Sequence, residues 1–69
     1  MFRRVLFVPS FATVSKIRSL LVEAGFHPAP LVEAYISGAD RGYYVEVLPE
    51  EVDRSREFLT AQGYAADLL

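Results

Sequence analysis

The chain has 69 residues, of which 52% are hydrophobic and 13% aromatic, and its formal net charge is −2. A chain of this length has room for one hydrophobic core, since it buries only about 60% of its unfolded surface, so we expect a single domain over residues 1–69. The negative charge provides no overall attraction to phosphate backbones or anionic lipid, which disfavours nucleic acid and excludes a membrane as partner.

The sequence contains no cysteine. This excludes thiol catalysis, zinc–thiolate sites and disulfides, and it fits a reducing compartment, so we expect a cytoplasmic protein. The start of the chain superficially resembles a signal peptide, with two arginines before an apolar run. However, Pro9 ends that run after four residues, which is too short for a signal peptide or a membrane span.

The first predicted strand covers residues 3–8. Its apolar run, Val5 to Val8, is typical of a strand buried on both faces, and we expect it at the centre of the sheet. Ser10 is expected to cap the following helix, with Thr13 as the alternative start. The helix is predicted from about Ala12 to Ala24, because apolar residues recur there at helical spacing.

Gly25 follows this helix and supplies the left-handed residue that closes many helices. Two more strands are predicted at Leu31–Ile36 and Tyr43–Leu48, separated by a loop suited to a hairpin. The segment Pro49-Glu50-Glu51 predicts the start of a second helix that runs to about Gln62, and Gly63 is expected to close it as Gly25 closes the first. Two alternatives stay open for the last six residues: a short final strand or a docked tail.

The order strand, helix, strand, strand, helix predicts the α+β class. We expect a ferredoxin-like, split βαββα two-layer sandwich, in which an antiparallel sheet carries both helices on one face. Alternation along the third strand directs its two valines towards the helices and leaves the other sheet face uncovered. The residues expected at an interface formed by this face are Leu6, Phe7, Glu33, Tyr35, Tyr44 and Glu46. The first strand contributes only one alternating set to the face, so which of its sides the helices cover stays open.

An apolar strand beside two tyrosines is poorly suited to water. We therefore expect the open face, or an edge of the sheet, to bind a partner. The partner is expected to be a second copy of the chain in a homo-oligomer, with a dimer favoured, or else another protein.

Three segments carry a resemblance to a known family. They are Leu20-Leu21-Val22-Glu23-Ala24-Gly25-Phe26 at the end of the first helix, Gly42-Tyr43-Tyr44-Val45-Glu46-Val47, and Pro49-Glu50-Glu51. With these segments the chain resembles a family of small prokaryotic domains that are named signal transducing proteins and have no known function. The resemblance implies a ferredoxin-like domain with a regulatory role, and it supplies no catalytic residues.

RNA binding is the alternative function. The segments 6–11 and 41–47 partly resemble the two short motifs of RNA recognition motif domains, which stack bases on sheet aromatics. The second motif needs aromatics two residues apart on one face, whereas Tyr43 and Tyr44 are adjacent and point to opposite sides. The net negative charge and Glu46 also disfavour RNA.

Other polar residues give no catalytic or metal-binding pattern. His27 is the only histidine and has no nucleophile or ligand set beside it in the sequence, so we interpret it as a surface residue. We interpret the acidic residues of the second helix as a solvated helix face rather than a cation site or an acid–base pair; they are Glu50, Glu51, Asp53 and Glu57. Glu50 with Arg54, and Asp53 with Arg56, are spaced there as ion pairs. We predict no catalytic residue, metal site or cofactor, which disfavours an enzyme.

The candidate ligand site is the loop containing Ser37, Gly38, Asp40, Arg41 and Gly42. It lacks the lysine and the following serine or threonine of a nucleotide-binding loop, but Arg41 offers a charge for a small molecule. The resulting hypothesis is a non-enzymatic regulatory or interaction module that self-associates and senses a small molecule at a subunit boundary.

Overall fold

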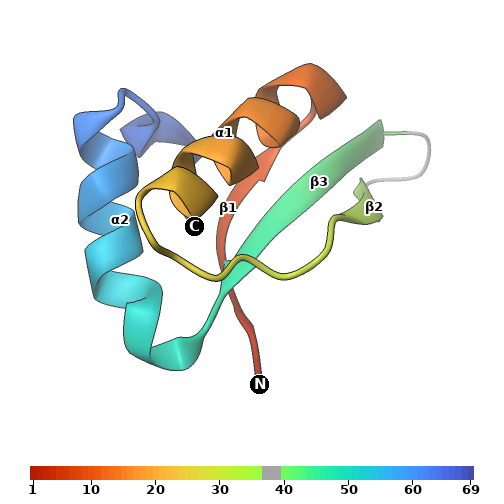
Figure 1. Cartoon of the computed structure of the whole chain (residues 1–69). Helices are drawn as coiled ribbons and strands as arrows, with labels where there is room; N and C mark the ends of the chain where they lie inside the picture. Colours follow the sequence, from red (N-terminus) through yellow and green to blue (C-terminus); the bar gives the residue numbers. More distant parts are fainter. Residues whose placement is uncertain (37–39) are drawn as a thin grey trace.

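The computed structural model describes residues 1–36 and 40–69, and for residues 32–36 and 40 it describes the backbone only. Figure 1 shows the arrangement of its helices and strands. In chain order the elements are β1 (Arg3–Val8), α1 (Phe11–Glu23), β2 (Val32–Ile36), β3 (Asp40–Val47), the 3₁₀ turn η1 (Pro49–Glu51), α2 (Val52–Ala61) and the 3₁₀ turn η2 (Ala65–Asp67). The predicted α+β class and the predicted order of helices and strands are confirmed.

Helix α1 begins and ends at caps that satisfy its free backbone groups. The Ser10 hydroxyl accepts a hydrogen bond from the Thr13 amide at 3.3 Å, which confirms Ser10 as the cap. At the other end Gly25 has a φ of +92°, and the Phe26 amide donates to the Leu21 carbonyl at 2.9 Å. This is the closure that a left-handed glycine allows, as the sequence predicts.

Helix α2 differs from the prediction in its first turn. Pro49 opens a 3₁₀ turn, and α-helical geometry begins only at Val52. Glu51, at the junction, is 3% exposed, although the sequence pattern placed it on a solvated helix face. The end of the helix is as predicted, since Gly63 has a φ of +94° and the Tyr64 amide donates to Leu59 O at 2.9 Å.

The three strands are ordered β1-β3-β2, and both pairings are antiparallel. The middle strand of these three is therefore β3, and not the first strand as expected. On its other side β1 meets the last residues of the chain, where Leu6 and Leu68 form an isolated bridge and the Leu69 amide donates to Val5 O at 3.0 Å. The tail thus docks beside β1 through a single bridge.

A β-bulge changes the phase of β1. Arg4 pairs with Glu46, but the next pair is Leu6 with Val45, so Val5 is an additional residue opposite one position of β3. Val5 and Leu6 are consecutive, yet both are fully buried. The apolar run therefore does not bury both faces of the strand. It places two neighbouring side chains in one core, and Phe7 emerges on the opposite face.

Both helices lie on the same side of the sheet (Figure 1), and the core lies between the two layers. The buried hydrophobic cluster consists of Val5, Leu6, Val8, Val14, Ile17, Leu21, Val45, Val47 and Leu59. The two valines of β3 point into it, as alternation predicts, while Tyr44 and Glu46 are only half-buried. Within the described residues, no helix has the length and apolar character needed to cross a bilayer.

Candidate functional site

Among the described side chains of β1 and β3, those of Arg4, Phe7, Tyr44 and Glu46 point away from the helices. We call these four residues, together with Gly42 between them, the open face. Arg4 pairs in register with Glu46, and Phe7 with Tyr44. Because directly opposed residues of antiparallel strands share a sheet face, each pair presents its two side chains side by side.

The Phe7 and Tyr44 rings form the apolar part of the open face. Their centroids are 5.0 Å apart and their planes are inclined by 57°, a tilted arrangement that aromatic rings favour. The Phe7 ring also lies directly over Gly42, so close that a Cβ atom there would overlap it. The absence of a side chain at Gly42 thus provides the space that the outer edge of the Phe7 ring occupies.

Arg4 links the aromatic pair to Glu46. Its guanidinium carbon lies 4.1 Å from the centroid of the Tyr44 ring, and its Nε atom lies 3.4 Å from Glu46 Oε2. The Arg4 side chain remains 57% exposed and that of Glu46 23% exposed. At this exposure the ion pair contributes at most about 1 kcal/mol, so both charges remain available to a partner.

Gly42→Ala tests the contact between Phe7 and Gly42. We expect the substitution to lower the free energy of unfolding by about 1 kcal/mol, because the added methyl group displaces the ring. In a Phe7→Ala background the same substitution should cost nothing, since the ring is gone. Urea denaturation of the four proteins in this double-mutant cycle measures the coupling, and strictly additive effects would contradict the contact.

Three residues expected on the open face are placed differently. Leu6 is 0% exposed and belongs to the core, because the bulge at Val5 shifts it to the helix side. Glu33 pairs in register with Tyr43, and Tyr35 with Arg41, so neither is opposite Tyr44 or Glu46. The register therefore does not support the expectation that Glu33 and Tyr35 share a sheet face with Tyr44 and Glu46. The side chains of residues 32–40 lie outside the described part of the chain.

The candidate ligand loop is only partly described. Ser37 and Gly38 lie outside the described residues, as does the side chain of Asp40. The backbone of residues 40–42 belongs to β3, so Arg41 and Gly42 are strand residues rather than loop residues. Gly42 serves the packing of the Phe7 ring.

Sequence reasoning missed a contact between His27 and Glu51. The buried Glu51 carboxylate accepts a hydrogen bond from the His27 backbone amide at 3.1 Å, and its other oxygen lies 2.7 Å from His27 Nδ1. The interpretation of His27 as a surface residue is confirmed, since its side chain is 72% exposed, but the sequence did not reveal its acidic neighbour. The two residues are 24 positions apart in the chain, and no local motif links them. The contact fastens the segment after α1 to the start of α2.

The environment of Glu51 makes stability depend on pH. The hydrogen bond from the His27 side chain lowers the pKa of Glu51 below its ordinary value of 4.5, although burial acts in the opposite direction. A lowered pKa in the folded state stabilises the protein above the ordinary carboxyl pKa, and this stabilisation is lost as the pH falls through the folded value.

We therefore expect the wild-type protein to lose stability more steeply than Glu51→Gln as the pH falls below about 4.5. The glutamine keeps the size and an oxygen acceptor for the His27 amide but does not titrate. Urea midpoints measured across this pH range for both proteins provide the test. Parallel pH profiles would contradict a linked Glu51.

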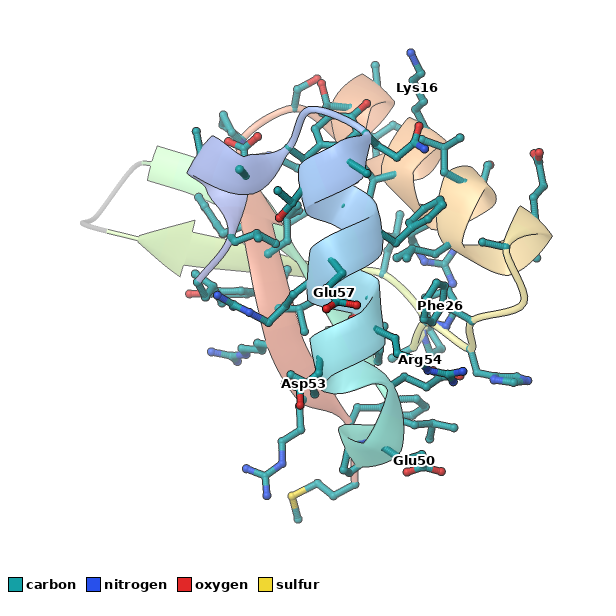
Figure 2. All side chains as sticks on the ribbon, turned by 90° about the vertical axis from the view of Figure 1, so that its left-hand side faces the viewer. Lys16, Phe26, Glu50, Asp53, Arg54 and Glu57 are labelled. Carbon is teal, nitrogen blue, oxygen red and sulfur yellow. The ribbon has the colours of Figure 1, made fainter. Side chains whose placement is uncertain are left out.

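The exposed surface of α2 carries charge without the predicted ion pairs. Among the described residues, neither Glu50 and Arg54 nor Asp53 and Arg56 approach as salt bridges. Arg54 lies 5.8 Å from the centroid of the Phe26 ring (Figure 2), and Arg56 donates to the Leu69 carbonyl at 2.6 Å. These arginines therefore connect α2 to other segments of the fold.

A shallow groove of about 610 Å³ lies on this helix layer, away from the open face. It is lined by Asp53, Arg56, Glu57, Thr60, Ala61 and Leu68. Over residues 1–36 and 40–69, no three histidine or acidic side chains come together as metal ligands. The open face is thus the most distinctive surface of the described chain. Comparisons with protein-family models, with curated proteins and with solved structures found no match.

Proposed function

We propose that this protein is a regulatory interaction module that forms a homodimer through its open face. The observation that carries the proposal is the pair of half-buried rings, Phe7 and Tyr44, on the sheet face opposite both helices. Adjacent aromatic rings with an arginine beside them are the kind of residues that dominate binding energy at protein interfaces. A second copy of the chain would remove these rings from water.

The limited core favours self-association. Ordering each residue costs roughly 1.5 kcal/mol, and a single small core leaves little net stability to offset that cost. The hydrophobic fraction of 52% is high for a monomer of this size, whose surface is large relative to its volume. Burial of the open face in a dimer would add apolar contacts that one copy lacks.

We also propose that the fold is ferredoxin-like and that the protein belongs with the small signal transducing domains that it resembles. The strand order β1-β3-β2 and the placement of both helices on one sheet face support the fold. The bridge between Leu6 and Leu68 gives further support, since a fourth strand of that fold would lie beside β1. A regulatory role follows from the resemblance.

Analytical ultracentrifugation tests the dimer directly. We expect the weight-average mass to rise from one chain to two chains between low and high micromolar concentration. Apolar contacts drive the expected dimer, so it should persist when the salt concentration is raised. A mass of one chain at every concentration would refute self-association.

RNA binding remains the second candidate, because Phe7 and Tyr44 do share a sheet face and Arg4 lies over one ring. Tyr43, in contrast, pairs with Val8 and contacts the core, so only one of the two adjacent tyrosines reaches the open face. Fluorescence anisotropy with labelled single-stranded RNA separates the two functions. Salt-sensitive binding that Tyr44→Ala abolishes would favour RNA over the dimer.

A small molecule at the subunit boundary would couple this dimer to a signal. Thermal-shift screening of metabolites finds such a ligand, because a compound that binds only the folded protein raises its melting temperature. A regulatory ligand should also change the concentration at which the dimer forms.

A further inference from the structure

We infer that the two open faces pack about a two-fold axis parallel to β1 and β3, so that Arg4 of each copy meets Glu46 of the other. This inference rests on the proposed dimer and specifies its geometry. The observation behind it is the register of the open face, in which the two charges form one cross-strand pair and the two rings form another.

The register determines which residues a two-fold axis exchanges. In face-to-face packing of identical sheets, the axis lies in the plane of the interface. Consider an axis that runs midway between β1 and β3 and parallel to both. It places β1 of one copy over β3 of the other, so that each residue lies over its register partner in the second copy. It therefore brings Arg4 against Glu46 of the second copy, and Phe7 against Tyr44 of the second copy.

An axis across the strands gives poorer contacts. It would place the charged pair of one copy over the aromatic pair of the other. Arg4 would then lie over Phe7 of the second copy, and Glu46 over the Tyr44 ring of the second copy. The face of an aromatic ring carries partial negative charge, so a carboxylate held over it is repelled. The charges of the open face therefore select the axis parallel to the strands, which also keeps the strands of the two sheets nearly aligned.

The two pairs have different roles in this arrangement. The rings lie in the centre and lose contact with water, which supplies most of the binding free energy. The Arg4 guanidinium already touches the Tyr44 ring and Glu46 within one copy, so it needs little reordering to reach the second copy. Its charge mainly determines the orientation of the two copies, because misplaced like charges are costly at an interface.

A charge exchange between two variants tests this geometry. In Arg4→Glu, a homodimer has only carboxylates at the four charged positions, and in Glu46→Arg it has only guanidinium groups. We expect each variant alone to dimerise at least roughly tenfold more weakly than the wild type, because like charges then face each other across the interface. When the two are mixed, every contact between copies joins opposite charges, so a heterodimer should form.

Native mass spectrometry distinguishes the heterodimer from both homodimers by mass. The matched control is a mixture of Lys16→Glu and Glu57→Arg, two exposed positions on the helix layer (Figure 2) with the same changes in net charge. We expect this mixture to show no preference for the heterodimer. Circular dichroism confirms that each variant is folded. The double variant Arg4→Glu with Glu46→Arg in one chain should recover the homodimer even where a single variant folds poorly.

The outcomes separate this inference from the proposed function. Weaker homodimers of both single variants, a heterodimer in the first mixture only and recovery in the double variant together support the parallel axis. An axis across the strands would place the substituted side chain of Glu46→Arg over the Tyr44 ring, where a cation is attracted, so that homodimer would not be weakened. A wild-type dimer without a heterodimer preference overturns the geometry but leaves self-association in place. An equal preference in the control mixture also overturns it, because general charge attraction then explains the result. A wild-type monomer at high micromolar concentration refutes both proposals.

Discussion

Leu6→Ala is expected to lower the free energy of unfolding by about 3 kcal/mol, since large-to-small changes at fully buried leucines cost about 2–5 kcal/mol. Leu6 is 0% exposed and belongs to the cluster that joins the sheet to both helices. A domain of 69 residues has a total stability of only about 3–10 kcal/mol, so this loss is a large fraction of the whole and should lower the melting temperature by about 12–24 °C.

Thermal and urea denaturation monitored by circular dichroism measure this loss. Val22→Ala is the control, because Val22 lies on α1 and is 57% exposed. It should change stability by less than about 0.5 kcal/mol. A Leu6→Ala protein that stays as stable as this control would place Leu6 outside the core and would contradict the bulge at Val5.

The second large effect concerns association. Phe7→Ala and Tyr44→Ala should each weaken the dimer by roughly a thousandfold. A central aromatic residue contributes about 2 kcal/mol, and each substitution occurs twice in a symmetric dimer, which gives about 4 kcal/mol. Both variants should remain folded, because each ring lies outside the buried cluster.

Sedimentation equilibrium measures the dissociation constants, and Phe11→Ala is the matched control. The Phe11 ring is also aromatic and exposed, but it belongs to α1 and contacts Tyr43, with ring centroids 5.6 Å apart. Its removal should leave the dissociation constant within about threefold of the wild type, because surface substitutions away from an interface have small effects. If Phe11→Ala disrupts the dimer while Phe7→Ala does not, the interface lies elsewhere.

Part of the open face is predictable from the sequence. Strict alternation in β3 directs Tyr44 and Glu46 away from the helices, and the structure agrees. The roles of Arg4 and Gly42 cannot be predicted from the sequence, because each depends on a residue far away in the chain. Arg4 meets Glu46, which is 42 positions further along the chain, only after the strands have paired. Gly42 has the pattern of a turn residue, whereas its position opposite the Phe7 ring explains it better.

The sequence left open which of Leu6 and Phe7 faces the core, and this has a specific physical cause. Alternation has a period of two, so one inserted residue reverses the face of every residue beyond it. The run Val5 to Val8 contains no polar residue that marks where the insertion falls. Only the pairing with β3 reveals that Val5 is additional.

The burial of Glu51 was also not predictable from the sequence, because it depends on a distant segment. The sequence places it in the first turn of a helix, where acidic residues are common and exposed. The hydrogen bonds that permit its burial come from His27, on a segment that tertiary packing brings to it. A buried carboxylate requires such partners, and local sequence does not identify them.

The sequence alone determined which segments form helices and strands, where Ser10, Gly25 and Gly63 begin or end them, and which valines of β3 face the core. These features depend on residues close together in the chain, where periodicity and backbone preference act directly. Tertiary structure decided the central position of β3, the bulge in β1 and the pairing of Arg4 with Glu46 and of His27 with Glu51. These depend on strand register and on the approach of distant segments, because the free energy that selects them arises only when the whole core packs.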